Sequence, residues 1–293
     1  MNLSLLLSQL FNGLQTGSIY ALVALGYSMV YGIILLLNFA HGDIIMVGGY
    51  TILVFLNLTG SPVVAILAAI VFCALLGVAV EKVAYKPLRG ASPLAVLITA
   101  IGVSYFLQSV SQMLFGSAPK TVILADLGVI RIGALPVSVA SVLTLLVTAL
   151  LMTALTLFIK FSRIGRAMVA VSEDRDAARL MGVNVNAVIT VTFAIGSALA
   201  AVAGAFYLLK YPTLSNTMGS MPGIKAFTAA VIGGIGSIPG AMLGGLLLGV
   251  IECVFNAFPA VSPYTDAVEF AILIVLLLVR PTGILGKKRR EKV

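Results

Sequence analysis

Long apolar runs, separated by short polar loops, constrain the fold of this chain more than any other feature. About 20 apolar residues in a helix span the hydrocarbon core of a bilayer, so most of the runs are long enough to cross one. Backbone polar groups in lipid must be satisfied within the segment, which predicts helices. The runs cover roughly residues 9–36, 43–58, 62–85, 94–115, 135–160, 187–209, 224–235, 239–258 and 264–281.

The scarcity of charge agrees with a membrane protein. Of the 293 residues, 60% are hydrophobic and 10% are charged, whereas soluble domains contain about 25% charged residues. We predict an all-α, polytopic transmembrane bundle of about eight spans, with nine or ten possible, forming a single domain over residues 1–293. Run 224–235 is short and is expected to be re-entrant or half of a broken helix. The N-terminal segment lacks the pattern of a signal peptide and is expected to remain in the mature protein.

Basic residues gather in three clusters, and this pattern predicts the orientation. Cytoplasmic loops are enriched in Lys and Arg, so the loop at about 160–186 and the basic tail 282–293 are expected in the cytoplasm. Loops 116–134 and 210–223 then face outward, and the N-terminus does too if run 224–235 crosses. The net charge of +8 therefore sets topology and does not imply nucleic-acid binding. The clusters are Lys82, Lys86 and Arg89; Lys160, Arg163, Arg166, Arg175 and Arg179; and Arg280, Lys287, Lys288, Arg289, Arg290 and Lys292.

The loop at 160–186 contains the signals of a short helix. Ser172 is the expected N-cap, Glu173 and Asp174 place negative charge on the first turn, and Gly182 fits the left-handed closing position. A helix of about nine residues is marginal in water, so it either docks against a partner or is a solvated connector. Its apolar face holds Ala177, Leu180 and Met181, at the i, i+3, i+4 spacing.

A polar break interrupts the apolar pattern at residues 38–50, NFAHGDIIMVGGY. Asn38, His41 and Asp43 there form either a turn that meets water or lipid headgroups, or a broken helix that lines a pathway. His41 is the only histidine, so a metal site would lack its usual partners, and we expect no metal or cofactor. The two cysteines, Cys73 and Cys253, lie in apolar runs and are interpreted as buried thiols.

Acidic side chains in the later runs need protonation, a partner or water. Glu252 lies inside an apolar run, where an acid costs about 2.5–3.5 kcal/mol at the bilayer centre, and no basic partner is identifiable from the sequence. Lys225, at the edge of a short run, is interpreted as a snorkelling residue. Asp266 and Glu269 follow a Ser-Pro cap at the last run and are explained by the helix dipole, with a proton relay as the alternative.

Small residues recur at four-residue spacing, which allows close helix packing either within the chain or at a subunit interface. Segment 233–245, GGIGSIPGAMLGG, lacks the lysine and spacing of a phosphate-binding loop, and a sharp break between two membrane helices is expected. The spaced residues are Gly196, Ala200 and Gly204; Gly240 and Gly244; and Gly245 and Gly249.

Four motifs together resemble one transporter family. Asp176-Ala177-Ala178, three residues, then Gly182 resembles the EAA-loop signature of ABC importer permeases, with Asp in place of the usual Glu. NFAHGDIIMVGGY, SEDRDAARLMGVNV, GSALAAVAGAFY and AFTAAVIGGIGSIPGAMLGGLLLG resemble the branched-chain amino acid ABC importer permeases of the LivH-like type. The resemblance covers essentially the whole chain.

The resemblance implies a transport subunit of the bacterial inner membrane rather than an enzyme. It implies a homologous second permease subunit, two cytoplasmic subunits that hydrolyse ATP, and a periplasmic or lipid-anchored binding protein that delivers branched-chain amino acids. The loop helix would couple the permease to ATP hydrolysis, through Glu173, Asp174, Asp176, Ala177, Ala178 and Gly182. The translocation path is expected beside Asn38, His41, Asp43 and Glu252.

Other functions stay open at this point. Relatives with these motifs are expected to import urea, short amides or other amino acids. A proton- or sodium-coupled transporter would use Glu252, Asp266 and Glu269, and a passive channel would need no partner. No arginine lies inside an apolar run, so strong recognition of an amino acid is expected to reside in the separate binding protein.

Overall fold

The computed structural model describes residues 3–34, 38–125, 127–132 and 135–286, so the tail residues Lys287 to Lys292 lie outside it. Within that part of the chain, eight helices are long and apolar enough to cross a membrane, as the sequence predicts. The elements are α1 (Leu3–Ile34), α2 (His41–Thr59), α3 (Pro62–Val80), the π-helix η1 (Glu81–Tyr85), α4 (Pro93–Phe115), β1 (Lys120–Thr121), β2 (Val129–Ile132), β3 (Leu135–Ser138), α5 (Val139–Phe161), α6 (Arg163–Glu173), α7 (Arg175–Leu180), α8 (Val185–Lys210), β4 (Thr213–Leu214), α9 (Ser220–Gly233), α10 (Ile238–Asn256), the 3₁₀ helix η2 (Ser262–Tyr264) and α11 (Thr265–Val279).

Helix α1 is the centre of the bundle and is buried from Gln15 to Val30. It packs against α5, α8, α9 and α10. Its closest neighbour is α10, because small residues let the two backbones touch: a Cβ added at Gly245 would lie 2.5 Å from the Cα of Ala21. On α8, Gly204 meets the backbone of Ile45 in the same way. The spaced glycines of α8 and α10 therefore pack helices within the chain.

Helices α3, α4, α5 and α11 form the periphery, and they expose long apolar side chains such as Leu75, Leu150 and Leu278. Apolar side chains of this kind suit a surface that faces lipid, because the lipid tails offer no hydrogen-bond partners. The start of the last helix differs from the sequence interpretation: Ser262 and Pro263 belong to η2, and α11 begins at Thr265.

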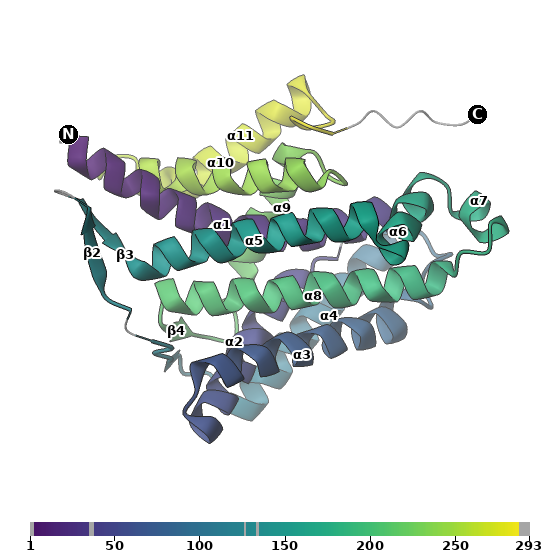
Figure 1. Ribbon diagram of the computed structural model, residues 1–293, viewed down its shortest axis with the longest axis horizontal. Helices are drawn as coiled ribbons and strands as arrows, with labels where there is room; N and C mark the ends of the chain where they lie inside the picture. Colours follow the sequence, from purple (N-terminus) through teal and green to yellow (C-terminus); the bar gives the residue numbers. More distant parts are fainter. Residues whose placement is uncertain (1–2, 35–37, 126, 133–134, 287–293) are drawn as a thin grey trace.

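The two ends of the bundle differ in structure (Figure 1). At one end lie the first turns of α1 and two short antiparallel ladders, β1 with β4 and β2 with β3. Helices α6 and α7 lie at the other end. Most of the expected short segment at 224–235 lies in α9, which has 14 residues, ends at Gly233 and begins beside the start of α2.

Candidate translocation path and coupling surface

The polar break between α1 and α2 is buried in the protein. Asn38, His41 and Asp43 are each only 2% exposed. The Tyr85 hydroxyl donates a hydrogen bond to Asn38 Oδ1 at 2.7 Å, and Gln108 Nε2 donates one to Asp43 Oδ1 at 2.8 Å. The three residues therefore face protein rather than water, although Tyr85 and Gln108 could not be recognised from the sequence as their partners.

The His41 ring occupies space left by two glycines. Any Cβ at Gly26 would collide with the imidazole, and one at Gly196 would lie 3.5 Å from it. Tyr27 meets the ring edge-on, with centroids 4.9 Å apart. The Nε2 atom of His41 has no hydrogen-bond partner among the described residues. This is an unfavourable state for a buried polar atom.

Helices α2 and α9 begin against each other. A Cβ at Gly42 would lie 2.7 Å from the carbonyl oxygen of Gly219, and one at Gly223 would lie 2.7 Å from the Cα of Gly42. Both N-termini carry partial positive charge, and Asp43 lies in the first turn of α2. A cavity of about 300 Å³ opens beside this crossing, lined by Phe39, Leu97, Ile101, Ser104, Tyr105, Gln108 and Ser220.

A second buried cluster surrounds Lys225 of α9. Its Nζ lies 3.0 Å from Glu252 of α10, and 2.8 Å and 3.3 Å from Asp266 and Glu269 of α11. The Tyr20 hydroxyl of α1 donates to the other oxygen of Glu252 at 2.7 Å. Lys225 is 6% exposed and Glu269 is fully buried.

This cluster corrects three sequence interpretations. Lys225 is an ion-pair partner inside the bundle and not a snorkelling residue, and Glu252 has that basic partner after all. Asp266 and Glu269 contact the same ammonium, so the helix dipole alone does not explain them. The sequence could not reveal the pairing because the four side chains come from three helices.

The short helix of the loop at 160–186 is α7, which is shorter than expected and begins later. Asp174 is the N-cap of α7, since its Oδ1 accepts from the backbone N–H groups of Asp176 and Ala177, both at 3.0 Å. The predicted cap, Ser172, is wrong because this residue still lies in the last turn of α6, where its hydroxyl donates to Val169. Gly182 has φ +82°, which confirms the left-handed closing position.

Helix α7 is tied to the bundle on one side and exposed on the other. The Arg175 guanidinium donates two hydrogen bonds to the carbonyl oxygen of Ile33, at 3.1 and 2.8 Å, and Ala178 is buried. In contrast, Leu180 is 89% exposed and Met181 is 84% exposed. The ion pair of Asp176 with Arg179, 3.7 Å long and exposed, adds little stability. Glu173 and Ala177 are not buried either.

A buried network near the base of α8 was not predicted from the sequence. Glu81 is fully buried and accepts hydrogen bonds from Arg89 and from the Thr190 hydroxyl, the latter at 2.8 Å. Arg89 also donates to Asn186. The network joins η1 and the loop before α4 to α8, which follows the loop at 160–186.

Comparison with known proteins identifies the family. A family model described as "Branched-chain amino acid transport system / permease component" matches residues 9–277, more than half of the chain. The chain belongs to this family. A permease protein of Pseudomonas aeruginosa, BraD, is 47% identical over 98% of both chains. LivH of Escherichia coli strain K12 is 46% identical, over 98% of this chain and 97% of its own. Both are named high-affinity branched-chain amino acid transport system permease proteins.

The fold was also compared with solved structures. PsaBC from Streptococcus pneumoniae, in complex with a Fab, is 17% identical with a TM-score of 0.49, over 92% of this chain and 91% of its own.

Proposed function

We propose that this chain is the membrane permease subunit of an ATP-driven importer of branched-chain amino acids. The observation that supports this most strongly is the similarity to BraD and LivH, which extends over nearly the full length of each relative. Because the match has no large missing part, the coupling loop and the buried break are both within the shared region.

The proposed importer has the parts that a permease without its own energy source needs. A homologous second permease subunit would complete the membrane pathway, and two cytoplasmic subunits would bind and hydrolyse ATP. A periplasmic or lipid-anchored binding protein would deliver leucine, isoleucine or valine at the outer side of the inner membrane, and the C-terminus of the permease would lie in the cytoplasm.

Helix α7 is the proposed contact with an ATP-binding subunit. It exposes Leu180 and Met181 at the end of the bundle, and apolar side chains on such a short polar loop suit a groove in a partner. Asp174 and Gly182 define where the helix begins and ends. Glu173, Asp176 and Ala177 lie beside the apolar pair and are proposed to complete the contact, with Ala178 supporting it from below.

The proposed translocation path passes the crossing of α2 and α9. Asn38, His41 and Asp43 lie on one side of it, and Glu252 lies in the Lys225 cluster beside α9. Paired helix N-termini and buried polar side chains at a helix break are the features from which substrate paths in membrane transporters are built.

Reconstitution tests the proposed function directly. The permease pair and its ATP-binding subunits are placed in proteoliposomes with ATP inside and binding protein loaded with radiolabelled leucine outside. We expect uptake that requires both ATP and the binding protein and that persists with a protonophore. Uptake driven by a proton gradient without ATP would contradict the proposal and would favour a coupled transporter that uses Glu252, Asp266 and Glu269.

The same liposomes test the solute. Competition by unlabelled valine and isoleucine, but not by urea or short amides, is the expected result. Competition by urea or amides alone would assign the chain to a different solute within the same family.

A further inference from the structure

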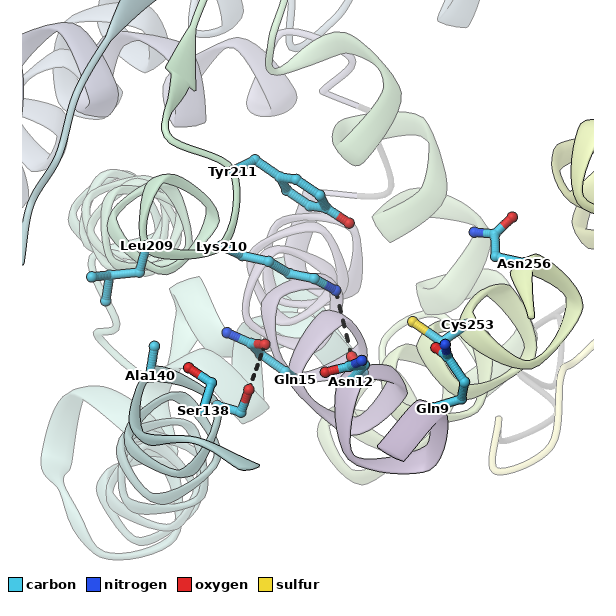
Figure 2. A pocket seen from close by; sticks show the side chains of 11 residues that line it. Gln9, Asn12, Gln15, Ser138, Ala140, Leu209, Lys210, Tyr211, Cys253 and Asn256 are labelled. Atoms are coloured by element: carbon cyan, nitrogen blue, oxygen red, sulfur yellow. Dashed lines mark hydrogen bonds between the residues drawn. The ribbon is translucent and has the colours of Figure 1, made fainter. Parts of the chain in front are cut away.

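Figure 2 shows a polar cavity. The helix ends that line it lie at the end of the bundle that contains the short strands, and α7 lies at the other end (Figure 1). Its volume is about 360 Å³, within the range of small-molecule sites. Its walls come from α1, α5, α8 and α10, and they include Gln15, Ser141, Lys210, Tyr211, Cys253 and Asn256. If α7 faces the cytoplasm, as the proposed function requires, this cavity faces the side from which substrate arrives.

Lys210 provides the positive charge of the cavity. Its ammonium group contacts the Thr16 hydroxyl and lies 3.5 Å from the carbonyl oxygen of Asn12, a contact that Figure 2 shows. No carboxylate forms an ion pair with it in the part of the chain that the structure describes, whereas Lys225 has three such partners. An ammonium without an acidic partner at a cavity wall attracts an anion.

Two amide side chains, those of Gln15 and Asn256, line the same cavity. Gln15 is 4% exposed, and its Oε1 accepts a hydrogen bond from the Ser141 hydroxyl at 2.7 Å. Asn256 Oδ1 accepts one from Thr265 at 2.8 Å. With both amide oxygens engaged, the NH₂ groups remain as donors. Burial raises the pKa of Tyr211 to about 12, so its hydroxyl stays protonated as well.

The cavity is also suited to the ammonium group of a zwitterionic amino acid. Helices α8 and α10 end at Lys210 and Asn256, at the cavity wall. Helix C-termini carry partial negative charge and can accept an ammonium group. Ala140, Leu209 and Cys253 add apolar wall for an aliphatic side chain.

We propose that this cavity is an outer subsite that binds the α-carboxylate of the arriving amino acid through Lys210 and the Gln15 amide. The proposal rests on the proposed import function and adds a residue-level docking point to it. The site is weak, because the Lys210 ammonium already contacts the Thr16 hydroxyl and the Asn12 carbonyl oxygen, and because the binding protein must release its ligand to it. A dissociation constant in the millimolar range follows from a single charged contact with a few neutral hydrogen bonds.

Saturation-transfer NMR on the purified full transporter tests the site without any transport step. Leucine, leucinamide and inorganic phosphate are the probes. We expect leucine to bind in the millimolar range and leucinamide, which has no carboxylate, to bind roughly tenfold more weakly. Equal binding of leucine and leucinamide would overturn the proposal. Displacement of leucine by phosphate at equal concentration would also overturn it, because the site would then be a general anion or lipid-headgroup site.

Variants assign the contact to Lys210. Lys210→Met is expected to weaken leucine binding roughly tenfold, and Lys210→Arg is expected to retain most of it. Lys120→Met, which removes a lysine on β1 at the same end but outside the cavity, is the matched control and should bind leucine like the wild type. Wild-type binding in Lys210→Met would overturn the assignment.

The experiments distinguish a failure of the subsite proposal from a failure of the proposed import function. If the wild-type transporter takes up leucine with ATP while Lys210→Met binds leucine normally, the subsite is wrong and the function stands. If the wild type shows no ATP-driven uptake of leucine, the import function fails, whatever the NMR titration gives. Should Lys210→Met not assemble, the comparison of leucine with leucinamide on the wild type still decides the question.

Discussion

Lys225 lies at the centre of a buried cluster of charged side chains that links three helices. One ammonium group faces three carboxylates, and only Asp266 among them is substantially exposed. A buried ion pair is a poor source of net stability, but removal of one partner leaves charge without compensation. The cluster therefore acts as a constraint that holds α9, α10 and α11 in one arrangement.

Lys225→Met should destabilise the protein by about 3–5 kcal/mol, because it leaves buried carboxylates without their cation. The double variant Lys225→Met with Glu269→Gln should recover part of that loss. Thermal unfolding of the purified chain in detergent measures both. The control is Arg179→Met, which breaks an exposed ion pair and should cost less than about 1 kcal/mol. A Lys225→Met protein as stable as the control would show that the cluster is not holding the helices.

The buried break makes a second prediction for single residues. Asn38→Ala and Asp43→Asn should lower leucine uptake several-fold more than they lower the amount of protein in the membrane, because Asp43 lies at the crossing of α2 and α9 and the Asn38 carbonyl oxygen accepts from the first residue of α2. Uptake assays paired with immunoblots of the membrane fraction give the ratio. If abundance falls in step with uptake, the two side chains serve only to fix the fold.

At the scale of elements, α7 owes its form to local signals. Asp174 caps its start, and Gly182 ends it with a positive φ that other residues adopt at a cost of about 1–2 kcal/mol. A helix of six residues has no stability of its own in water. The bonds of Arg175 to α1 hold its base, and the exposed pair Leu180 and Met181 forms the proposed contact with a partner.

Gly182→Val should therefore reduce leucine uptake per ATP hydrolysed while the permease still inserts and assembles. The matched control is Gly60→Val, at a left-handed glycine with φ +66° at the end of α2. Neither position has an atom near an added Cβ, so both substitutions impose only backbone strain. Proteoliposome uptake and ATPase rates measured together provide the ratio. Normal coupling in Gly182→Val would contradict the role of α7, as would an equal defect in Gly60→Val.

The elements show what a single sequence could and could not predict. Apolar run length predicted the spans, and the positive φ of Gly182 followed from glycine at a helix end. The start of α7 was missed because Ser172 and Asp174 are both good caps and only the course of α6 decides between them. The partners of Lys225 and Asp43 were missed because they belong to distant segments. The short strands were missed because ladders of two and four residues are too short for a clear alternating pattern.

At the scale of the whole molecule, the two ends should lie on opposite sides of the membrane. A cysteine at Met181 should resist an impermeant maleimide applied to intact cells, whereas one at Val129 on β2 should react, since both positions are exposed. The native thiols Cys73 and Cys253 are buried and give a low background. Inverted vesicles stripped of the ATP-binding subunits should reverse the result for Met181. Labelling of Met181→Cys from outside would overturn the orientation.

The whole transporter is expected to leave specificity to its binding protein. Isothermal calorimetry of the purified permease complex with leucine, valine or isoleucine, without binding protein, should show no heat of binding in the micromolar range. The reason is that Lys210, which has no carboxylate partner among the described residues, offers a single charged contact at the cavity wall. Micromolar binding would point instead to a self-sufficient transporter.

Helix α1 gives the molecule a mechanical property. It runs unbroken over 32 residues, about 48 Å, and contains no proline. One of its ends accepts the hydrogen bonds of Arg175 from α7, and toward its other end Gln9 and Asn12 form part of the cavity wall. As long as those hydrogen bonds persist, a displacement of α7 should tilt or shift α1 as one rigid helix. In the orientation proposed above, α1 would therefore link the position of α7 to the shape of the cavity at the opposite end of the bundle.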